Sequence, residues 1–226
     1  GPAGLAVGIG FAAMFFASPG QSFLLAVFVD DMLEGTGLSR TMFSSLYAAG
    51  TVVSALVTAS VGRYSDRFGI VPTWIVVSTA LAGSCLIASV ASGPIGAFIA
   101  LAALRAFGQG SLPLLGTLLV ARTLGSMRGR GLSITMFGHT TAGMILPPLI
   151  TILIIGIGWR SAYQVLAGVT ALALIPLFIL VGKVVNAQTL SSVGEQTEDH
   201  QSWPSPLRKI RSLNNLEIPT RACGTL

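Results

Sequence analysis

Two side chains that can carry a charge lie deep inside long apolar stretches of the sequence, Arg105 and His139. A charged group in the hydrocarbon of a bilayer costs at least about 2.5–3.5 kcal/mol, so it must face water or a partner. No aspartate or glutamate occurs within these stretches to neutralise Arg105. Because a guanidinium group binds carboxylates through paired hydrogen bonds, Arg105 is a candidate receptor for an anion. The alternatives are an arginine bonded to backbone carbonyls, or one paired with an acid in another part of the protein.

His139 has two interpretations of its own. An imidazole can relay a proton or bind a substrate. The alternative is a neutral histidine that is hydrogen-bonded to Thr140, to Thr141 or to a neighbouring helix.

Two glutamines lie in similar surroundings within the first and fourth apolar stretches. Gln21 follows Pro19 and Gly20, and Gln109 follows Gly108 and precedes Pro113. Interruptions at matching positions of two repeats point to a binding site in transporters. The hypothesis is that Gln21 and Gln109 flank a substrate pathway together with Arg105; chance similarity between glycine-rich apolar stretches is the alternative.

The composition is that of a membrane protein. The 226 residues are 52% hydrophobic and 9% charged, whereas soluble domains carry about 25% charged residues. This balance excludes a disulfide-stapled secreted scaffold, a disordered chain and a nucleic-acid-binding domain. Cys85 and Cys223 lack metal-ligand spacing, and neither paired carboxylates nor an H-E-x-x-H motif is present. We therefore expect no metal, no cofactor and no enzymatic activity.

Six apolar segments are each long enough to cross a bilayer as an α-helix. The sequence therefore predicts an all-α, multi-pass membrane protein embedded in the lipid bilayer. An acidic loop at Asp30, Asp31 and Glu34 is expected after the first segment. The segments cover about Gly4 to Val29, Thr41 to Val61, Thr73 to Ala91, Ile95 to Ala121, Gly131 to Ile157 and Ala162 to Val185.

The basic residues predict the orientation of these segments. Lysine and arginine gather in the connections after segments two, four and six, whereas the opposite side holds only Arg40 and Arg160. The positive-inside rule then places both chain ends in the cytoplasm and the protein in the cell membrane. Residues 1–186 should form the bundle and residues 187–226 a largely disordered cytoplasmic linker. Within the linker, residues 206–216 suggest a short interfacial helix or, equally, a solvated basic patch.

The connection after segment two carries a recognisable pattern, G-x-x-x-D-R-x-G, formed by Gly62, Asp66, Arg67 and Gly69. It resembles the signature loop of the major facilitator superfamily. The run from Arg105 to Ser111 and the turn Gly158-Trp159-Arg160 are similar to other motifs of that family. Together with Pro147-Pro148, they resemble the branch of monocarboxylate and oxalate/formate carriers.

The resemblance implies a fold of six helices in two inverted three-helix repeats, which is half of a twelve-helix facilitator. It implies secondary active transport of a small solute by alternating access, as a symporter or antiporter, with the signature loop as a conformational gate. The chain is then expected to be a fragment that lacks its C-terminal six-helix half. Alternatives are a half-transporter that acts as a dimer, or a non-transporting membrane protein. Two departures are the absence of a lysine in segment one and of an acid at the end of segment four to pair with Arg67.

Overall fold

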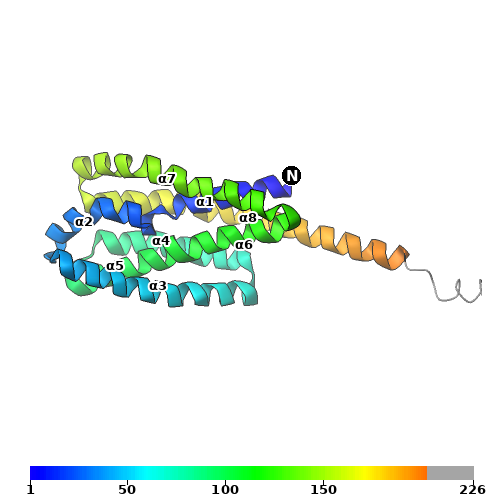
Figure 1. Ribbon diagram of the computed structural model, residues 1–226, viewed down its shortest axis with the longest axis horizontal. Coiled ribbons are helices and arrows are strands. Elements are labelled where there is room, and N and C mark those ends of the chain that lie inside the picture. Colours follow the sequence, from blue (N-terminus) through cyan, green and yellow to red (C-terminus); the bar gives the residue numbers. More distant parts are fainter. Residues whose placement is uncertain (203–226) are drawn as a thin grey trace, which may run out of the picture. The chain divides into compact units, whose positions relative to one another are not determined.

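The computed structural model describes residues 1–202, and the side chains of residues 1–125 and 127–187 (Figure 1). In this part of the chain, six helical stretches are long and apolar enough to cross a membrane. The prediction of an all-α protein with six crossings is therefore confirmed. By internal contacts the chain forms two units, Gly1–Asn186 and Ala187–Leu226, and the first contains all the features described below.

The first crossing, Pro2–Thr36, is interrupted near its middle. It consists of α1 (Pro2–Phe16), a 3-10 turn (Ser18–Gly20) and α2 (Ser22–Thr36). The prediction of an acidic loop at Asp30, Asp31 and Glu34 is wrong, because these residues belong to α2. A helix can extend beyond the hydrocarbon, where water solvates its carboxylates, so hydropathy marks the membrane boundary and not the helix end.

The second and third crossings are α3 (Arg40–Phe68) and α4 (Ile70–Ser89). The predicted loop from Gly62 to Gly69 is mostly helix, since α3 continues through Asp66 and Arg67. The stretch contains no proline, and only Gly69 leaves the helical conformation, at φ +93°. A side chain would be strained at this φ, so a glycine makes the turn between the two helices.

The fourth crossing is interrupted at its middle, as the first is. It consists of α5 (Gly93–Leu104), a seven-residue π-helix (Arg105–Ser111) and α6 (Leu112–Leu124). The first and fourth crossings, which are the expected first helices of two three-helix repeats, are therefore both irregular near their middle.

A short 3-10 turn (Gly125–Met127) leads to the fifth crossing, α7 (Arg128–Ile157), and the sixth begins α8 (Trp159–Ser202). The helix α8 continues into the stretch expected to be a linker, where residues 187–202 contain no proline to end it. The candidate interfacial helix at residues 206–216 lies outside the described residues.

Two apolar clusters hold the bundle together, one on each side of the interrupted level. One cluster joins α2, α5 and the start of α8, with Phe28 stacked on Tyr163 at 4.1 Å between ring centroids. The other joins α1, α4, α6 and the later part of α8, where the Trp74 indole donates to the carbonyl of Leu174 at 3.1 Å. The polar residues at the interruptions thus lie between two packed apolar layers.

The helices α3 and α7 are the least covered crossings and lie at opposite edges of the view in Figure 1. In their most apolar stretches only 17% and 11% of residues are buried, compared with at least 50% for the first, third and fourth crossings. These two helices therefore offer the largest surfaces to lipid or to another membrane-embedded partner.

Candidate functional site

The interruptions of the first and fourth crossings pack directly against each other through Gly20 and Gly108. A β-carbon on Gly20 would lie 2.8 Å from the Gly108 α-carbon, and one on Gly108 would lie 2.7 Å from the Gly20 α-carbon. Neither position has room for a side chain. This backbone contact places the first crossing beside the fourth at the level of Arg105.

The π-helix that follows Leu104 carries Arg105 as its first residue. Its wider turn is supported by Ser111, whose hydroxyl donates to the carbonyl of Ala106, five residues earlier, at 2.7 Å. Single π-turns of this kind occur frequently at functional sites. Arg105 is only 5% exposed, so its guanidinium group is held inside the bundle.

Arg105 binds two hydroxyl groups from other crossings. Its Nη1 donates to the hydroxyl oxygen of Tyr47 on α3 and, at 3.5 Å, to that of Ser22 on α2. The guanidinium carbon also lies 4.2 Å from the centroid of the Tyr47 ring, a cation–π contact, and the hydroxyls of Ser22 and Tyr47 are 2.8 Å apart. We refer to Arg105, Tyr47 and Ser22 as the Arg105 cluster.

The charge of Arg105 is not matched by a carboxylate within residues 1–187. The two ion pairs in this range are Asp30–Arg40 and Asp66–Arg122. The Nε atom of Arg105 is buried and has no hydrogen-bond partner. The site thus holds a buried cation with one donor unused.

Two cavities border the Arg105 cluster. The larger, of about 570 Å³, lies between α3 and the fourth crossing and includes Arg105. The smaller, of about 300 Å³, lies between α2 and α3 and includes Ser22 and Tyr47. The hydrogen bonds of the cluster therefore join Arg105, which lines the larger cavity, to Ser22 and Tyr47, which line the smaller one. The larger cavity is lined by Thr51, Ser54, Ala55, Thr58, Ala59, Gly62, Arg105, Gln109, Gly110 and Leu114.

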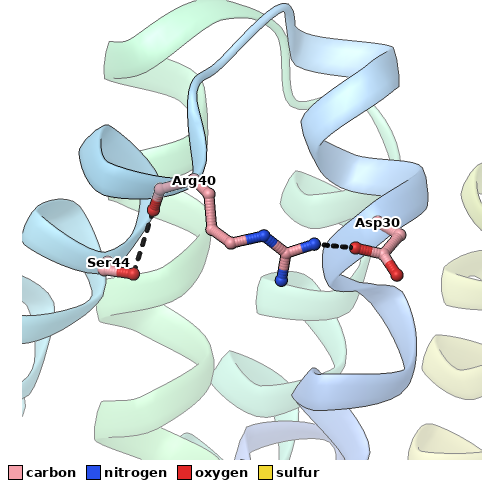
Figure 2. Close-up of polar contacts among 3 residues, drawn as sticks. All are labelled: Asp30, Arg40 and Ser44. Carbon is pink, nitrogen blue, oxygen red and sulfur yellow. Dashed lines mark hydrogen bonds and ion pairs between the residues drawn. The ribbon is translucent and has the colours of Figure 1, made fainter.

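Arg40, which lines the smaller cavity, forms an ion pair with Asp30, and Figure 2 shows this pair. Arg40 donates to the carboxylate of Asp30 at 2.5 Å, and the Ser44 hydroxyl donates to the backbone carbonyl of Arg40 at 2.9 Å. The pair joins the second half of α2 to the first residue of α3. Both side chains are more than two-thirds exposed, so water weakens their attraction.

The structure places the other predicted substrate-binding residues in different surroundings. Gln109 lines the larger cavity together with Arg105, and its Oε1 is buried without a partner. Gln21 is buried in the extended position just before α2, where its side chain makes no capping hydrogen bond, and it lines neither cavity. His139 on α7 is half-buried against Phe23, with ring centroids 5.3 Å apart, and also lines neither cavity.

The signature residues are also separated by the fold. Gly62 lines the larger cavity, whereas Asp66 accepts from Arg122 on α6 at 2.9 Å. The guanidinium carbon of Arg67 lies 5.2 Å from the ring centroid of Phe68. Among the described residues, Asp66 and not Arg67 forms an ion pair, and its partner Arg122 belongs to the fourth crossing.

Four polar residues of this site were not singled out from the sequence, namely Tyr47, Thr51, Ser54 and Thr58. They recur at intervals of three or four residues, so they lie along one face of α3. That spacing was the available signal. Their neighbours in the sequence are mostly apolar, so the sequence did not indicate which helix this face of α3 contacts.

Comparison with protein families gives a match to the model described as Major Facilitator Superfamily, over residues 10–219. Comparison with curated proteins and with solved structures gave no match. The resemblance to the monocarboxylate and oxalate/formate branch is not supported by these findings.

Proposed function

Because the chain belongs to the major facilitator superfamily and is therefore a multi-pass membrane transporter of that type, we propose that it carries a small organic anion by secondary active transport. The observation that carries this proposal is Arg105, a buried cation without a carboxylate partner in the described part of the chain. An anionic substrate would supply the missing negative charge.

The surroundings of Arg105 suit a carboxylate ligand. A guanidinium group has five N–H donors; Arg105 uses Nη1 for hydroxyl oxygens and leaves Nε unused. The adjacent cavity of about 570 Å³ is in the usual range for small-molecule sites. Its α3 face supplies only hydroxyl, methyl and glycine surfaces, which leaves room for a ligand beside the guanidinium group.

We propose that transport proceeds by alternating access, with the Arg105 cluster opening towards one cavity and then the other. The uncovered faces of α3 and α7 support packing against a second six-helix half, around which the first half would rock. The distribution of basic residues supports a location in the cell membrane with both chain ends in the cytoplasm. We also propose a co-transported proton, with His139 as its candidate carrier because it is the one histidine within the six apolar segments.

Uptake into proteoliposomes tests the proposal. The native protein should accumulate labelled short carboxylates when a proton gradient is imposed, and should not accumulate neutral solutes of the same size. Arg105→Gln should abolish uptake. Arg105→Lys should retain a small part of it, because a lysine keeps the positive charge but lacks the paired N–H donors of the guanidinium group. Arg63→Gln is the matched control, since Arg63 is exposed and lines neither cavity. Carboxylate uptake that Arg105→Gln leaves intact would exclude this site.

A further inference from the structure

Two polar atoms of residues that line the larger cavity have no role in binding Arg105. Gln109 Oε1 and Thr58 Oγ1 are both buried and have no hydrogen-bond partner. Thr58 projects from α3 against Gly110, the residue after Gln109, and a β-carbon on Gly110 would lie 3.1 Å from that of Thr58. Gln109 and Thr58 therefore line the same cavity from its two sides, the π-helix and α3.

Buried polar groups in native proteins are nearly always hydrogen-bonded, so these atoms indicate a missing partner. An amide oxygen only accepts hydrogen bonds, whereas the Nε of Arg105 only donates them. All three atoms are unpartnered, so Gln109 and Arg105 do not satisfy each other across this space. A complementary ligand must accept from Arg105 and donate to Gln109.

We infer that the substrate is a small carboxylate that also bears a hydroxyl group, and that Gln109 and Thr58 select it by binding this hydroxyl. The inference rests on the proposed function, because it assigns the carboxylate to Arg105. Gln109 follows Arg105 by four residues within the π-helix, close to one turn, so the two side chains leave the helix on the same side and the ligand groups that they bind must be close together. A hydroxyl within a few bonds of the carboxylate meets this condition.

Thr51 shows why Thr58 is distinctive. Both threonines line the larger cavity from α3, but the Thr51 hydroxyl donates to the carbonyl of Tyr47 within its own helix at 2.8 Å. The Thr58 hydroxyl lacks such a bond. The two residues are thus a matched pair, one with its hydroxyl satisfied and one with its hydroxyl available to a ligand.

The test compares butyrate with 2-, 3- and 4-hydroxybutyrate as competitors of labelled uptake by the native protein in proteoliposomes. At least one hydroxybutyrate should compete about tenfold more strongly than butyrate, the contribution of one hydrogen bond. Gln109→Met, which keeps the length and removes the acceptor, should abolish the preference for a hydroxybutyrate over butyrate. Thr58→Val should reduce the preference, and Thr51→Val should not.

Each result has a defined meaning. One outcome is that carboxylates compete in a manner that depends on Arg105 while the hydroxyl group has no effect. In that case water is the partner of the Gln109 and Thr58 oxygens, so the inference is wrong and the proposed function stands. If the preference persists in both Gln109→Met and Thr58→Val, its assignment to these residues is wrong. If no carboxylate competes, the proposed function fails together with the inference. Thermal unfolding measures whether each variant is folded. If Gln109→Met does not fold, the comparison of Thr58→Val with Thr51→Val provides the test.

Discussion

Gly20 and Gly108 meet backbone to backbone, although 3-10 geometry surrounds the first and π geometry the second. Their contact joins the two irregular crossings directly. In lipid, helices associate through close packing of small residues because no hydrophobic force draws them together. This contact therefore fixes the distance from α2, which carries Ser22, to the π-helix, which carries Arg105.

We predict that Gly108→Ala destabilises the protein by at least about 1–3 kcal/mol, because the new methyl group meets backbone atoms that cannot rotate away. The midpoint of thermal unfolding in detergent measures the loss. Gly83→Ala is the control, since a β-carbon at this helical position meets nothing within 4 Å. This variant should be neutral or more stable, by up to about 1 kcal/mol. Equal midpoints for the two variants would contradict the close approach.

A second prediction concerns the hydroxyl of Tyr47. Tyr47→Phe keeps the ring over Arg105 but removes the oxygen that accepts from Nη1. Because the donor is charged and buried, the free energy of unfolding should fall by about 1.5–3 kcal/mol. Tyr64→Phe serves for comparison, because Tyr64 is exposed and contacts Phe68 through its ring. Thermal unfolding should show little change for that variant, and similar losses in both would indicate that Arg105 does not depend on Tyr47.

The ion pair of Asp66 with Arg122 should contribute little to stability by itself. The side chains are 69% and 46% exposed, and exposed pairs contribute about 0.2–1 kcal/mol. A double-mutant cycle with Asp66→Asn and Arg122→Gln should give a coupling energy in that range, and added salt should lower it. The same cycle on the more exposed pair of Asp30 and Arg40 should give a value no larger. A coupling above about 2 kcal/mol would show that the pair is shielded from water.

The predicted orientation can be measured by cysteine labelling in intact cells. In a Cys223→Ser background, a membrane-impermeant maleimide should react with the cysteine of Arg40→Cys and not with that of Arg63→Cys. Both positions are exposed and lie near opposite ends of α3. Buried Cys85 should remain unlabelled in either variant. If only the Arg63→Cys variant is labelled, the orientation is opposite to the predicted one and the basic connections lie outside.

The sequence by itself determined the class of the protein, the number of crossings and the presence of a charge inside one of them. These features depend on local properties, since about 20 apolar residues are needed to span the hydrocarbon wherever they pack. The motifs around Asp66 and Trp159 were enough to indicate the superfamily. Helix ends were less predictable, because α2 and α3 continue past the apolar stretches that mark their membrane portions.

Only the tertiary structure decided which residues meet. Tyr47 approaches Arg105, Gly20 approaches Gly108 and Asp66 binds Arg122, although each pair is far apart in the sequence. In a soluble helix, an apolar stripe identifies the buried face. A helix in lipid is apolar on its outer and inner faces alike, so hydropathy does not reveal how it is rotated. The rotation of α3, which turns Tyr47, Thr51 and Thr58 towards the π-helix, follows from close packing of the whole bundle.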